Sequence, residues 1–453
     1  MKPIHAIILA AGKGTRMNST KPKVLQKLAD KPLLGHVLDQ AFGVSEQVHV
    51  VYGFGGDQVQ QAFNDNRIKW SEQAQQLGTG HAVMQAMPNV DENAMVLVLY
   101  GDVPLVKTTT LTRLIEAAQP SGIGLLSVVL DDPTGYGRIV RNDQGQIQSI
   151  VEQKDADSQT LEICEVNTGI MAVKSKLLSQ YLSNISTDNA QGELYLTDII
   201  ALAVADNKTI ASVTTNNENE VAGVNDKQQL AALERVFQQD QAAEFMASGL
   251  LLKDPNRFDV RGSLSFGQDC EIDVNVVLEG EVILGDNVSI APNCVIKNAK
   301  ISSNVTILEN SVIEGARIGA GASIGPFARL RPEAEIGTDA KIGNFVEVKK
   351  STIGTGSKVS HLSYIGDTIM GAEVNIGAGV ITCNYDGVNK HQTVIEDKVF
   401  VGSDSQLVAP VTIGKNSTVG AGSTITKNTP ENQLSLSRSK QMSLKNWQPP
   451  RKK

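Results

Sequence analysis

An aliphatic residue returns every six positions through most of the C-terminal half of this 453-residue chain, and no other feature restricts its fold as strongly. The hexads run in three stretches, which begin at Val260, Ile318 and Ile395, and the last stretch ends at Ile425. A period of six fits neither the 3.6-residue turn of an α-helix nor a heptad. It suits a short strand followed by a corner, and stacked coils of such units predict a parallel β-solenoid.

Two irregularities in the hexads are informative. The step shortens to five at four positions, where we expect the aliphatic side chain to stay inside at the cost of one corner residue: Ile301, Ile318, Ile353 and Met370. Between Thr382 and Ile395 the period breaks altogether, over the segment CNYDGVNKHQTV. Because insertions in solenoid repeats project outward and commonly lie on the functional face, this loop is a candidate site for chemistry.

The composition excludes some classes of function. With 41% apolar and 20% charged residues the chain is an ordinary soluble protein, and its formal net charge of −8 gives no reason to expect nucleic acid as a partner. No stretch approaches the roughly 18–20 apolar residues of a membrane-spanning helix, so we expect no membrane span. The four cysteines lack metal or redox spacing, which favours reduced thiols and a cytoplasmic protein.

The N-terminal half has a different organisation. Residues 1–226 alternate short apolar runs with helical stretches, which predicts a Rossmann-like α/β domain with a mainly parallel sheet. Residues 227–248 are rich in Ala, Gln, Glu and Leu and contain neither Gly nor Pro, which predicts one connecting helix that stops at Gly249. We expect the hexad domain to span residues 249–453, with a polar tail after Ile425 whose last residues are basic.

A glycine-rich loop, AGKGTRMNSTKPKVL, follows the first predicted strand. Gly12 and Gly14 let the backbone approach a ligand closely, and exposed N–H groups in such a loop bind phosphate. Arg16 and Lys23 add two cations. The loop lacks the third glycine of the dinucleotide-binding fingerprint and the G-K-[ST] of the ATPase P-loop, so neither of those classes is favoured.

With KPKVL after it, the segment LAAGKGTRM resembles the signature of sugar-nucleotide pyrophosphorylases. The segments QLGTGHA, LYGDVPL, DPTGYGRIV, EQKDA, EVNTGI and GVND, together with the hexads, make the chain similar to the bifunctional N-acetylglucosamine-1-phosphate uridylyltransferase/glucosamine-1-phosphate acetyltransferase family. The resemblance covers nearly the whole chain. It implies synthesis of UDP-N-acetylglucosamine for peptidoglycan and lipopolysaccharide, a homotrimer, and a left-handed β-helix, although the hexads do not reveal handedness.

The resemblance also implies a uridylyl-transfer site in the first domain, which binds UTP and a sugar 1-phosphate. The residues that would bind the nucleotide are Leu9, Ala10, Ala11, Gly12, Lys23, Gln73, Gly78, Thr79, Tyr100, Gly101 and Asp102. Gly137, Glu152 and Asn167 would hold the sugar, although such residues are also common turn caps.

The same resemblance implies that Asp102 holds Mg²⁺ together with Asn225. Asp102 ends the predicted strand MVLVLYGD, where open α/β sheets bind ligands, although alone it would be an ordinary turn residue. Arg16 and Lys23 would stabilise charge on the transferring and leaving phosphates, because phosphoryl-type transfer depends on positioning and electrostatics.

His361 is the candidate catalytic residue of the hexad half. Val359 and Ser363 take the inward positions of its hexad, which leaves His361 and Tyr364 facing outward. A lone surface histidine is usually inert, but stacking of the coils brings cations and the inserted loop near it. His391 in that loop is the competing base.

By resemblance, His361 is the general base of acetyl transfer from acetyl-CoA, the co-substrate, to glucosamine 1-phosphate. Arg331 and Lys349 would bind the sugar phosphate, and Tyr364 and Asn375 would position the sugar. The residues that resemble acetyl-CoA contacts are Ala378, Asn384, Tyr385, Ser403, Ala421 and Arg438. A covalent acetyl-Cys383 is a disfavoured alternative, because no base lies beside Cys383 in sequence.

Two other functions stay open from sequence. One is a monofunctional pyrophosphorylase with a regulatory β-helix, disfavoured by the full-length solenoid and by His361 near the inserted loop. The other is a non-catalytic scaffold, disfavoured by Arg16, Lys23 and Asp102. Release of the acetyl-CoA thiol in the presence of glucosamine 1-phosphate would separate all three.

Overall fold

The structure is a computed structural model that describes residues 3–450, so the last residues of the predicted basic tail lie outside the described part. Contacts divide the chain into two compact units, and the division falls between Phe237 and Gln238, inside helix α9 (Lys227–Ala247). Gly249 follows this helix with a φ of +104°, a conformation that suits a helix stop.

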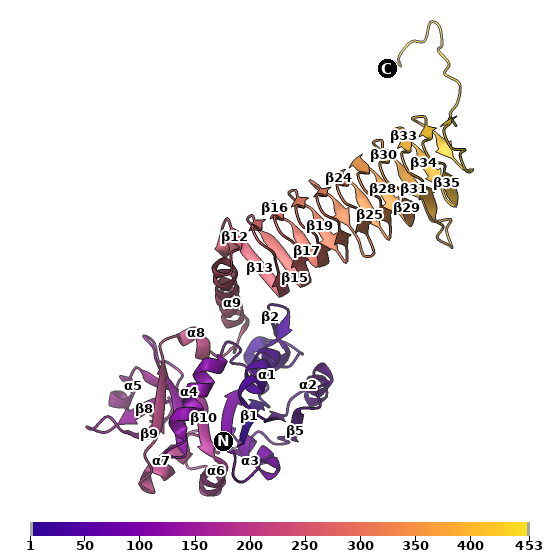
Figure 1. Cartoon of the computed structure of the whole chain (residues 1–453). Helices are drawn as coiled ribbons and strands as arrows, with labels where there is room; N and C mark the ends of the chain where they lie inside the picture. Colours follow the sequence, from indigo (N-terminus) through magenta and orange to yellow (C-terminus); the bar gives the residue numbers. More distant parts are fainter. Residues whose placement is uncertain (1–2, 451–453) are drawn as a thin grey trace. The chain divides into compact units, whose positions relative to one another are not determined.

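The first unit contains a nine-stranded sheet with the path order β11-β7-β10-β6-β1-β4-β5, to which β8 and β9 add at β10 (Figure 1). Strands β1, β4, β5 and β6 run parallel, and β7 is parallel to β11, as the alternating pattern predicts. Strand β10 runs antiparallel to both β6 and β7, a reversal that its apolar pattern does not encode. The nine strands are β1 (Ile4–Ala10), β4 (Gln47–Tyr52), β5 (Ile68–Glu72), β6 (Met95–Tyr100), β7 (Ile123–Val129), β8 (Arg138–Arg141), β9 (Ile147–Val151), β10 (Glu165–Lys174) and β11 (Ala211–Thr215), and a separate two-stranded sheet is formed by β2 (Lys27–Leu28) and β3 (Lys31–Pro32).

Helices cover both faces of this sheet. Alternate residues of β6 enter two separate apolar cores: Leu97 and Leu99 belong to one, and Val96 and Val98 to the other. This double burial explains why β6 is a continuous apolar run. The helices are α1 (Leu33–Val44), α2 (Gly56–Ala62), α3 (Thr79–Ala86), α4 (Thr108–Ala118), α5 (Ser158–Leu161), α6 (Ser175–Leu182), α7 (Asp198–Ala205) and α8 (Glu218–Val221), with 3-10 turns η1 (Thr15–Met17), η2 (Lys23–Leu25) and η3 (Met87–Asn89).

The second unit is a parallel β-helix, which confirms the fold predicted from the hexads. Its parallel strands form three ladders. The first ladder is β12 (Leu251–Leu252), β14 (Glu271–Ile272), β16 (Ser289–Ile290), β18 (Thr306–Ile307), β21 (Ser323–Ile324), β24 (Lys341–Asn344), β27 (Lys358–His361), β30 (Asn375–Ile376), β33 (Phe400–Val401), β36 (Thr418–Val419) and β38 (Leu434–Ser435).

The other two ladders diverge from three long strands that follow η4 (Pro255–Arg257): β13 (Phe258–Ser265), β15 (Val276–Leu284) and β17 (Val295–Ile301). One branch is β19 (Val312–Glu314), β22 (Arg329–Leu330), β25 (Glu347–Lys349), β28 (Tyr364–Gly366), β31 (Ile381–Cys383), β34 (Gln406–Val408) and β37 (Thr424–Ile425). The other is β20 (Arg317–Ile318), β23 (Glu335–Ile336), β26 (Thr352–Ile353), β29 (Thr368–Met370), β32 (Thr393–Ile395) and β35 (Val411–Ile413).

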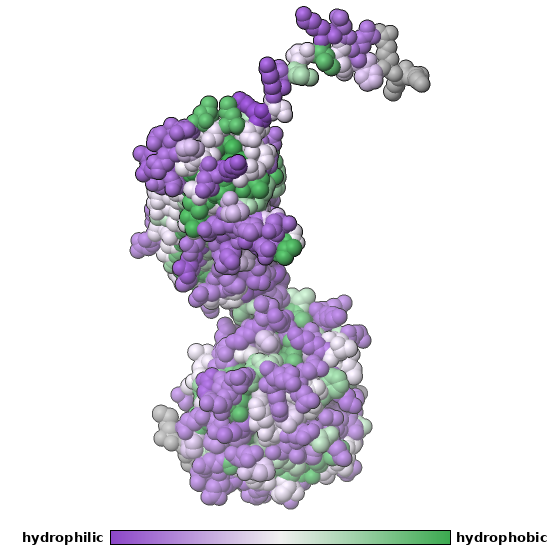
Figure 2. All heavy atoms as spheres, turned by 90° about the vertical axis from the view of Figure 1, so that its right-hand side faces the viewer, coloured by the Kyte–Doolittle hydropathy of each residue, from purple (hydrophilic) through white to green (hydrophobic). Residues whose placement is uncertain are grey.

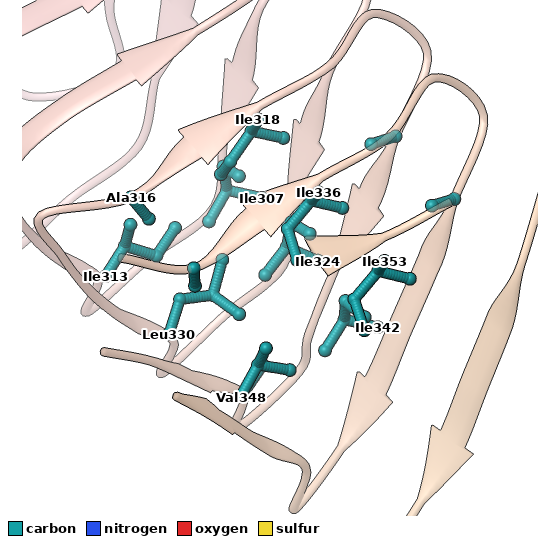
Figure 3. Packing of buried hydrophobic residues seen from close by; sticks show 14 of the residues in the cluster. Ile307, Ile313, Ala316, Ile318, Ile324, Leu330, Ile336, Ile342, Val348 and Ile353 are labelled. Carbon is teal, nitrogen blue, oxygen red and sulfur yellow. The ribbon is translucent and has the colours of Figure 1, made fainter. Parts of the chain in front are cut away.

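The hexad aliphatics form the core of the β-helix and stack on one another from coil to coil (Figure 3). Ile324 pairs with Ile342, a coil of 18 residues, whereas Ile301 pairs with Ile318, a coil of 17. Ile301 remains 2% exposed, so the five-residue step shortens a corner and keeps the aliphatic inside, as expected. Phe266 is an exception, because it packs against this core only partly buried.

The break in the hexads is an outward loop. Tyr385 and Lys390 form an isolated antiparallel bridge, and Val388 at the tip is 83% exposed. The coil that carries the loop pairs Met370 with Ile395 across 25 residues, so the extra chain is extruded while the aliphatic stack continues. Within residues 3–450, no helix is both long and apolar enough to cross a membrane.

Candidate active sites

A cavity of about 320 Å³ lies at the carboxyl ends of β1 and β6 in the first unit. Ten of the residues predicted to bind nucleotide line it: Leu9, Ala10, Ala11, Gly12, Lys23, Gln73, Gly78, Thr79, Tyr100 and Asp102. An added Cβ at Gly12 would meet nothing within 4 Å, so the backbone of the glycine-rich loop stays open to a ligand. Gly101 is not among the lining residues, and its N–H donates to the Leu9 carbonyl at 3.0 Å.

One wall of the cavity is made by two crossing loops. Gly78 has a φ of +112°, and an added Cβ there would lie 2.5 Å from the Leu194 carbonyl oxygen. The Gly80 N–H donates to that same oxygen at 2.8 Å, and the Leu194 N–H donates to Leu77 at 2.8 Å. Gln73, which is 3% exposed, donates to the Gly78 carbonyl at 3.1 Å. Gly78 is therefore required by this close backbone packing.

The predicted metal pair converges on one cation. The Lys23 ammonium contacts the Asp102 carboxylate and donates to the Asn225 amide oxygen at 3.2 Å. The Val224 N–H donates to the Asp102 carbonyl at 2.9 Å, which brings Asn225, two residues before α9, close to the end of β6. Arg16, in contrast, is exposed in η1 and is not among the residues that line the cavity.

The three predicted sugar residues form a second cluster beside Tyr100. An added Cβ at Gly137 would lie 3.3 Å from the Glu152 carboxyl, and the Asn167 N–H donates to the Gly137 carbonyl at 2.8 Å. Burial raises the pKa of Glu152, although the Thr197 hydroxyl donates to it at 3.1 Å. Burial also raises the pKa of Tyr100, and the charges of Glu152 and Asp102 add to the rise. Tyr100 thus adjoins both the cavity and the sugar cluster.

Sequence reasoning missed four residues that also line the cavity: Val24, Gln76, Ala82 and Glu193. Gln76 and Ala82 lie inside the QLGTGHA motif and Val24 inside KPKVL, so the motifs themselves contained that signal. Glu193 reaches the cavity from a loop more than a hundred residues further along the chain, and no sequence pattern indicates it. It belongs to the wall built on Leu194.

His361 ends β27 and is exposed, as predicted, while Val359 and Ser363 are buried. Its Nδ1 lies 2.8 Å from the Asn344 Oδ1, and the two residues are register partners on neighbouring coils. An amide oxygen only accepts, so this contact places the proton on Nδ1 and leaves Nε2 as the free acceptor. Asn344 had no sequence signal of its own.

The corner that carries His361 continues along the solenoid. The registers Val359–Ile376, Ile376–Val401 and Val401–Val419 place four residues one above another, two positions beyond each aliphatic: His361, Ala378, Ser403 and Ala421. Arg438 reaches back from the tail and donates to the Ala421 carbonyl at 3.0 Å. The structure thus aligns His361 with most of the predicted acetyl-CoA contacts.

The predicted phosphate-binding cations lie on the next face. Arg331 follows β22 and donates to Glu347 at 2.9 Å, and Lys349 ends β25. Tyr364 pairs with Glu347 on the adjacent coil. Asn375 belongs to the ladder of His361, where it pairs with Lys358. In one chain, His361 and these cations therefore flank a corner rather than share a face.

That corner carries an apolar ridge, Phe327, Phe345 and Leu362. The two phenyl rings stack with centroids 5.3 Å apart, and the three side chains are 48%, 55% and 62% exposed. Figure 2 shows hydrophobic side chains gathered in patches on one face of the second unit. The face of the first unit in the same view is mostly hydrophilic. An exposed apolar strip beside a polar site commonly marks an interface.

The inserted loop supplies a cation that the sequence analysis did not single out. The Asn384 amide donates to Asp367, and Tyr385 is 60% exposed. Close contact with the Lys349 ammonium lowers the pKa of Lys390. His391, the competing base, is bound to Asp386 at 2.8 Å within the loop itself, so its ring already has a partner.

Cys383 is half-buried, and burial raises the pKa of its thiol. A raised pKa disfavours the thiolate, so the structure gives no support to a covalent acetyl-cysteine. Cys294 is 0% exposed in the core, and all four cysteines are free thiols.

Comparison with known proteins gives separate family matches for the two units. Residues 6–150 match the MobA-like NTP transferase domain, and residues 265–298, 315–350 and 392–427 match the bacterial transferase hexapeptide (six repeats). The bifunctional protein GlmU of Ruthia magnifica subsp. Calyptogena magnifica is 67% identical over 453 residues, 100% of both chains. That of Vesicomyosocius okutanii subsp. Calyptogena okutanii is 63% identical and covers 98% of this chain and 99% of the relative.

A third relative, the bifunctional protein GlmU of Psychrobacter sp. (strain PRwf-1), is 56% identical and covers 99% of each chain. The matched length extends through both units in all three relatives. The chain therefore belongs to the family of bifunctional GlmU proteins.

Proposed function

We propose that this chain makes UDP-N-acetylglucosamine in two steps, acetylation of glucosamine 1-phosphate and then uridylyl transfer to the product. The observation that carries the proposal is the presence of two polar clusters in separate units. One is the cavity around Lys23 and Asp102, and the other is the His361–Asn344 pair at a solenoid corner. The functional domains we assign are residues 1–226 and 249–453, with residues 227–248 as the linker.

In the first domain, an oxygen of the sugar 1-phosphate attacks the α-phosphorus of UTP, and pyrophosphate leaves. The glycine-rich loop binds the phosphates through its backbone N–H groups, and Lys23 neutralises their charge. Gln73 and the Gly78 wall hold the uridine, and Glu152 holds the sugar. Arg16 is free to reach the leaving phosphates from η1, because it is exposed at the edge of the same loop.

The residues present fit Mg²⁺. The Asp102 carboxylate and the Asn225 amide oxygen already converge on the Lys23 ammonium, and oxygen ligands are those that Mg²⁺ prefers. Within residues 3–450 no group of three or more His, Cys, Asp or Glu could hold a metal, so phosphate oxygens would complete the coordination. When bound, the ion supplies charge stabilisation for the transferring and leaving phosphates.

In the second domain, the amine nitrogen of glucosamine 1-phosphate attacks the thioester carbonyl of acetyl-CoA, and His361 Nε2 accepts a proton from that amine. The new N–C bond replaces the C–S bond, and the coenzyme leaves as its thiolate. Asn344 holds the imidazole in the tautomer that this role needs. The stack of Ala378, Ser403 and Ala421, with Arg438 at its end, provides an extended strip for the coenzyme.

Arg331 and Lys349 bind the sugar phosphate, and Lys390 joins them from the inserted loop. Two ammonium groups in contact repel unless an anion lies between them, so the Lys349–Lys390 contact favours a phosphate site. Tyr364 and Asn375 position the sugar, and Asn384 and Tyr385 contact the acetyl group or the coenzyme.

The assembly we propose is a homotrimer. In one chain the apolar ridge separates His361 from Arg331 and Lys349, so a second copy packed against the ridge would bring both kinds of group to one substrate. The free cysteines favour a cytoplasmic enzyme, and the net charge gives no reason to expect a nucleic-acid partner.

The test is a pair of assays on the full chain. Thiol release from acetyl-CoA should require glucosamine 1-phosphate, and pyrophosphate release from UTP should require N-acetylglucosamine 1-phosphate and Mg²⁺. Pyrophosphate release without thiol release would favour the monofunctional enzyme with a regulatory β-helix. Absence of both activities in the folded protein would favour a scaffold.

A further inference from the structure

Lys23 lies where the first domain is expected to bind its metal. Its ammonium contacts the two oxygens assigned to that metal, the carboxylate of Asp102 and the amide oxygen of Asn225 at 3.2 Å. The side chains of Lys23 and Asp102 are only 14% and 18% exposed. A single cation thus satisfies both proposed ligands in the free protein.

The backbone around Lys23 is fixed by close packing. Gly14, with a φ of +59°, would place an added Cβ 2.6 Å from the Cβ of Lys23. An added Cβ at Gly55 would lie 2.5 Å from the ring of Pro22, the residue before Lys23. The main chain is therefore held, and the long flexible side chain is the part that can move.

A divalent cation and the Lys23 ammonium cannot both occupy the oxygens of Asp102 and Asn225. One carboxylate balances one ammonium, so a metal that arrives alone must displace Lys23 and leave that charge poorly compensated inside the cavity. A nucleotide triphosphate changes this balance, because its phosphates offer Lys23 a new anionic partner.

We propose that Lys23 acts as an internal counter-ion that withholds Asp102 and Asn225 from divalent cations until a nucleotide triphosphate draws its ammonium group away. This inference rests on the proposed role of Asp102 and Asn225 as metal ligands. It gives Lys23 two successive partners, the metal ligands in the free protein and the phosphates in the complex. Metal and nucleotide then bind cooperatively, since each favours the same movement of Lys23.

The test measures binding of Mn²⁺ alone to the full chain, without nucleotide, from the electron paramagnetic resonance signal of the free ion. Lys23→Gln and Lys23→Met should each bind Mn²⁺ about tenfold more tightly than the unmodified chain, a factor that corresponds to about 1.4 kcal/mol of removed competition. Lys21→Gln is the matched control, because Lys21 is exposed on the same loop and should leave the affinity unchanged.

Circular dichroism establishes that each variant is folded. Unchanged or weaker Mn²⁺ binding in both folded Lys23 variants would overturn the inference. Adding Asp102→Asn to Lys23→Gln should abolish the tight binding. If the double variant still bound Mn²⁺ tightly, the assignment of the metal to Asp102 would be wrong, which is a failure of the proposed function and distinct from the first outcome.

Discussion

Gly78→Ala tests the wall of the nucleotide cavity. Gly78 has φ +112° and ψ 174°, a region that is essentially restricted to glycine and costs other residues about 1–3 kcal/mol. The added Cβ would also lie 2.5 Å from the Leu194 oxygen and 2.8 Å from its nitrogen, both backbone atoms. Relieving that overlap costs roughly a further 1–3 kcal/mol, because it strains the hydrogen bonds of Leu194 to Leu77 and Gly80. We expect a total destabilisation of about 3 kcal/mol or more.

Gly145→Ala is the matched control. Gly145 has a φ of +76° in the β8–β9 turn, and an added Cβ meets nothing within 4 Å, so only the conformational cost of about 1–2 kcal/mol applies. Urea unfolding of the first unit is followed by the fluorescence of Trp70, in a Trp447→Phe background. The KM for UTP should rise at least about tenfold in Gly78→Ala alone, because its wall shifts. Equal unfolding midpoints and equal KM values in the two variants would refute the packing argument.

Three further changes probe other parts of the protein. Burial lowers the pKa of His49 to about 4, so the unfolded state binds the proton more readily and stability falls as pH drops from about 6.5 to 4. In urea titrations, His49→Leu should remove about 3 kcal/mol of that loss. If the unfolding free energy of the variant fell with pH as steeply as that of the unmodified chain, this expectation would be contradicted. Asn344→Ala should slow thiol release about 10–100-fold by freeing the His361 ring, with uridylyl transfer intact. Phe345→Ser should dissociate the proposed trimer in sedimentation experiments and reduce acetyl transfer, and a variant that still sediments as a trimer would argue against the ridge as the interface.

Much of the second unit is predictable from sequence, because the position of a residue in the hexad indicates whether its side chain is buried. Each hexad aliphatic must enter a narrow core, so the positions of Ile324 or Leu330 fix the inward face and leave the corners to the remaining residues. The five-residue steps and the outward loop follow from the same requirement. In the first unit, alternating apolar runs predict the parallel strands, but the antiparallel direction of β10 is not predictable, because its long-range pairing has no local signature.

The sites are predictable only where a motif places the residues close together along the chain. Asn344 supports His361 through a register of 17 residues, which becomes visible only when the coils are stacked. Glu193 and Lys390 reach their sites on loops, where side-chain position depends on tertiary contacts rather than on pattern. Arg16 was expected at the phosphates from its place in the motif, yet it is exposed outside the cavity lining in the free protein.

The most direct test of two independent sites in one chain is a crossed assay of Asp102→Asn and His361→Ala. We expect Asp102→Asn nearly to abolish pyrophosphate release and to leave thiol release unchanged, because only the first site needs a metal carboxylate. His361→Ala should slow thiol release about 10²–10⁴-fold and leave pyrophosphate release unchanged. If either folded variant lost both activities, or if His361→Ala kept normal thiol release, the assignment of one reaction to each unit would be contradicted.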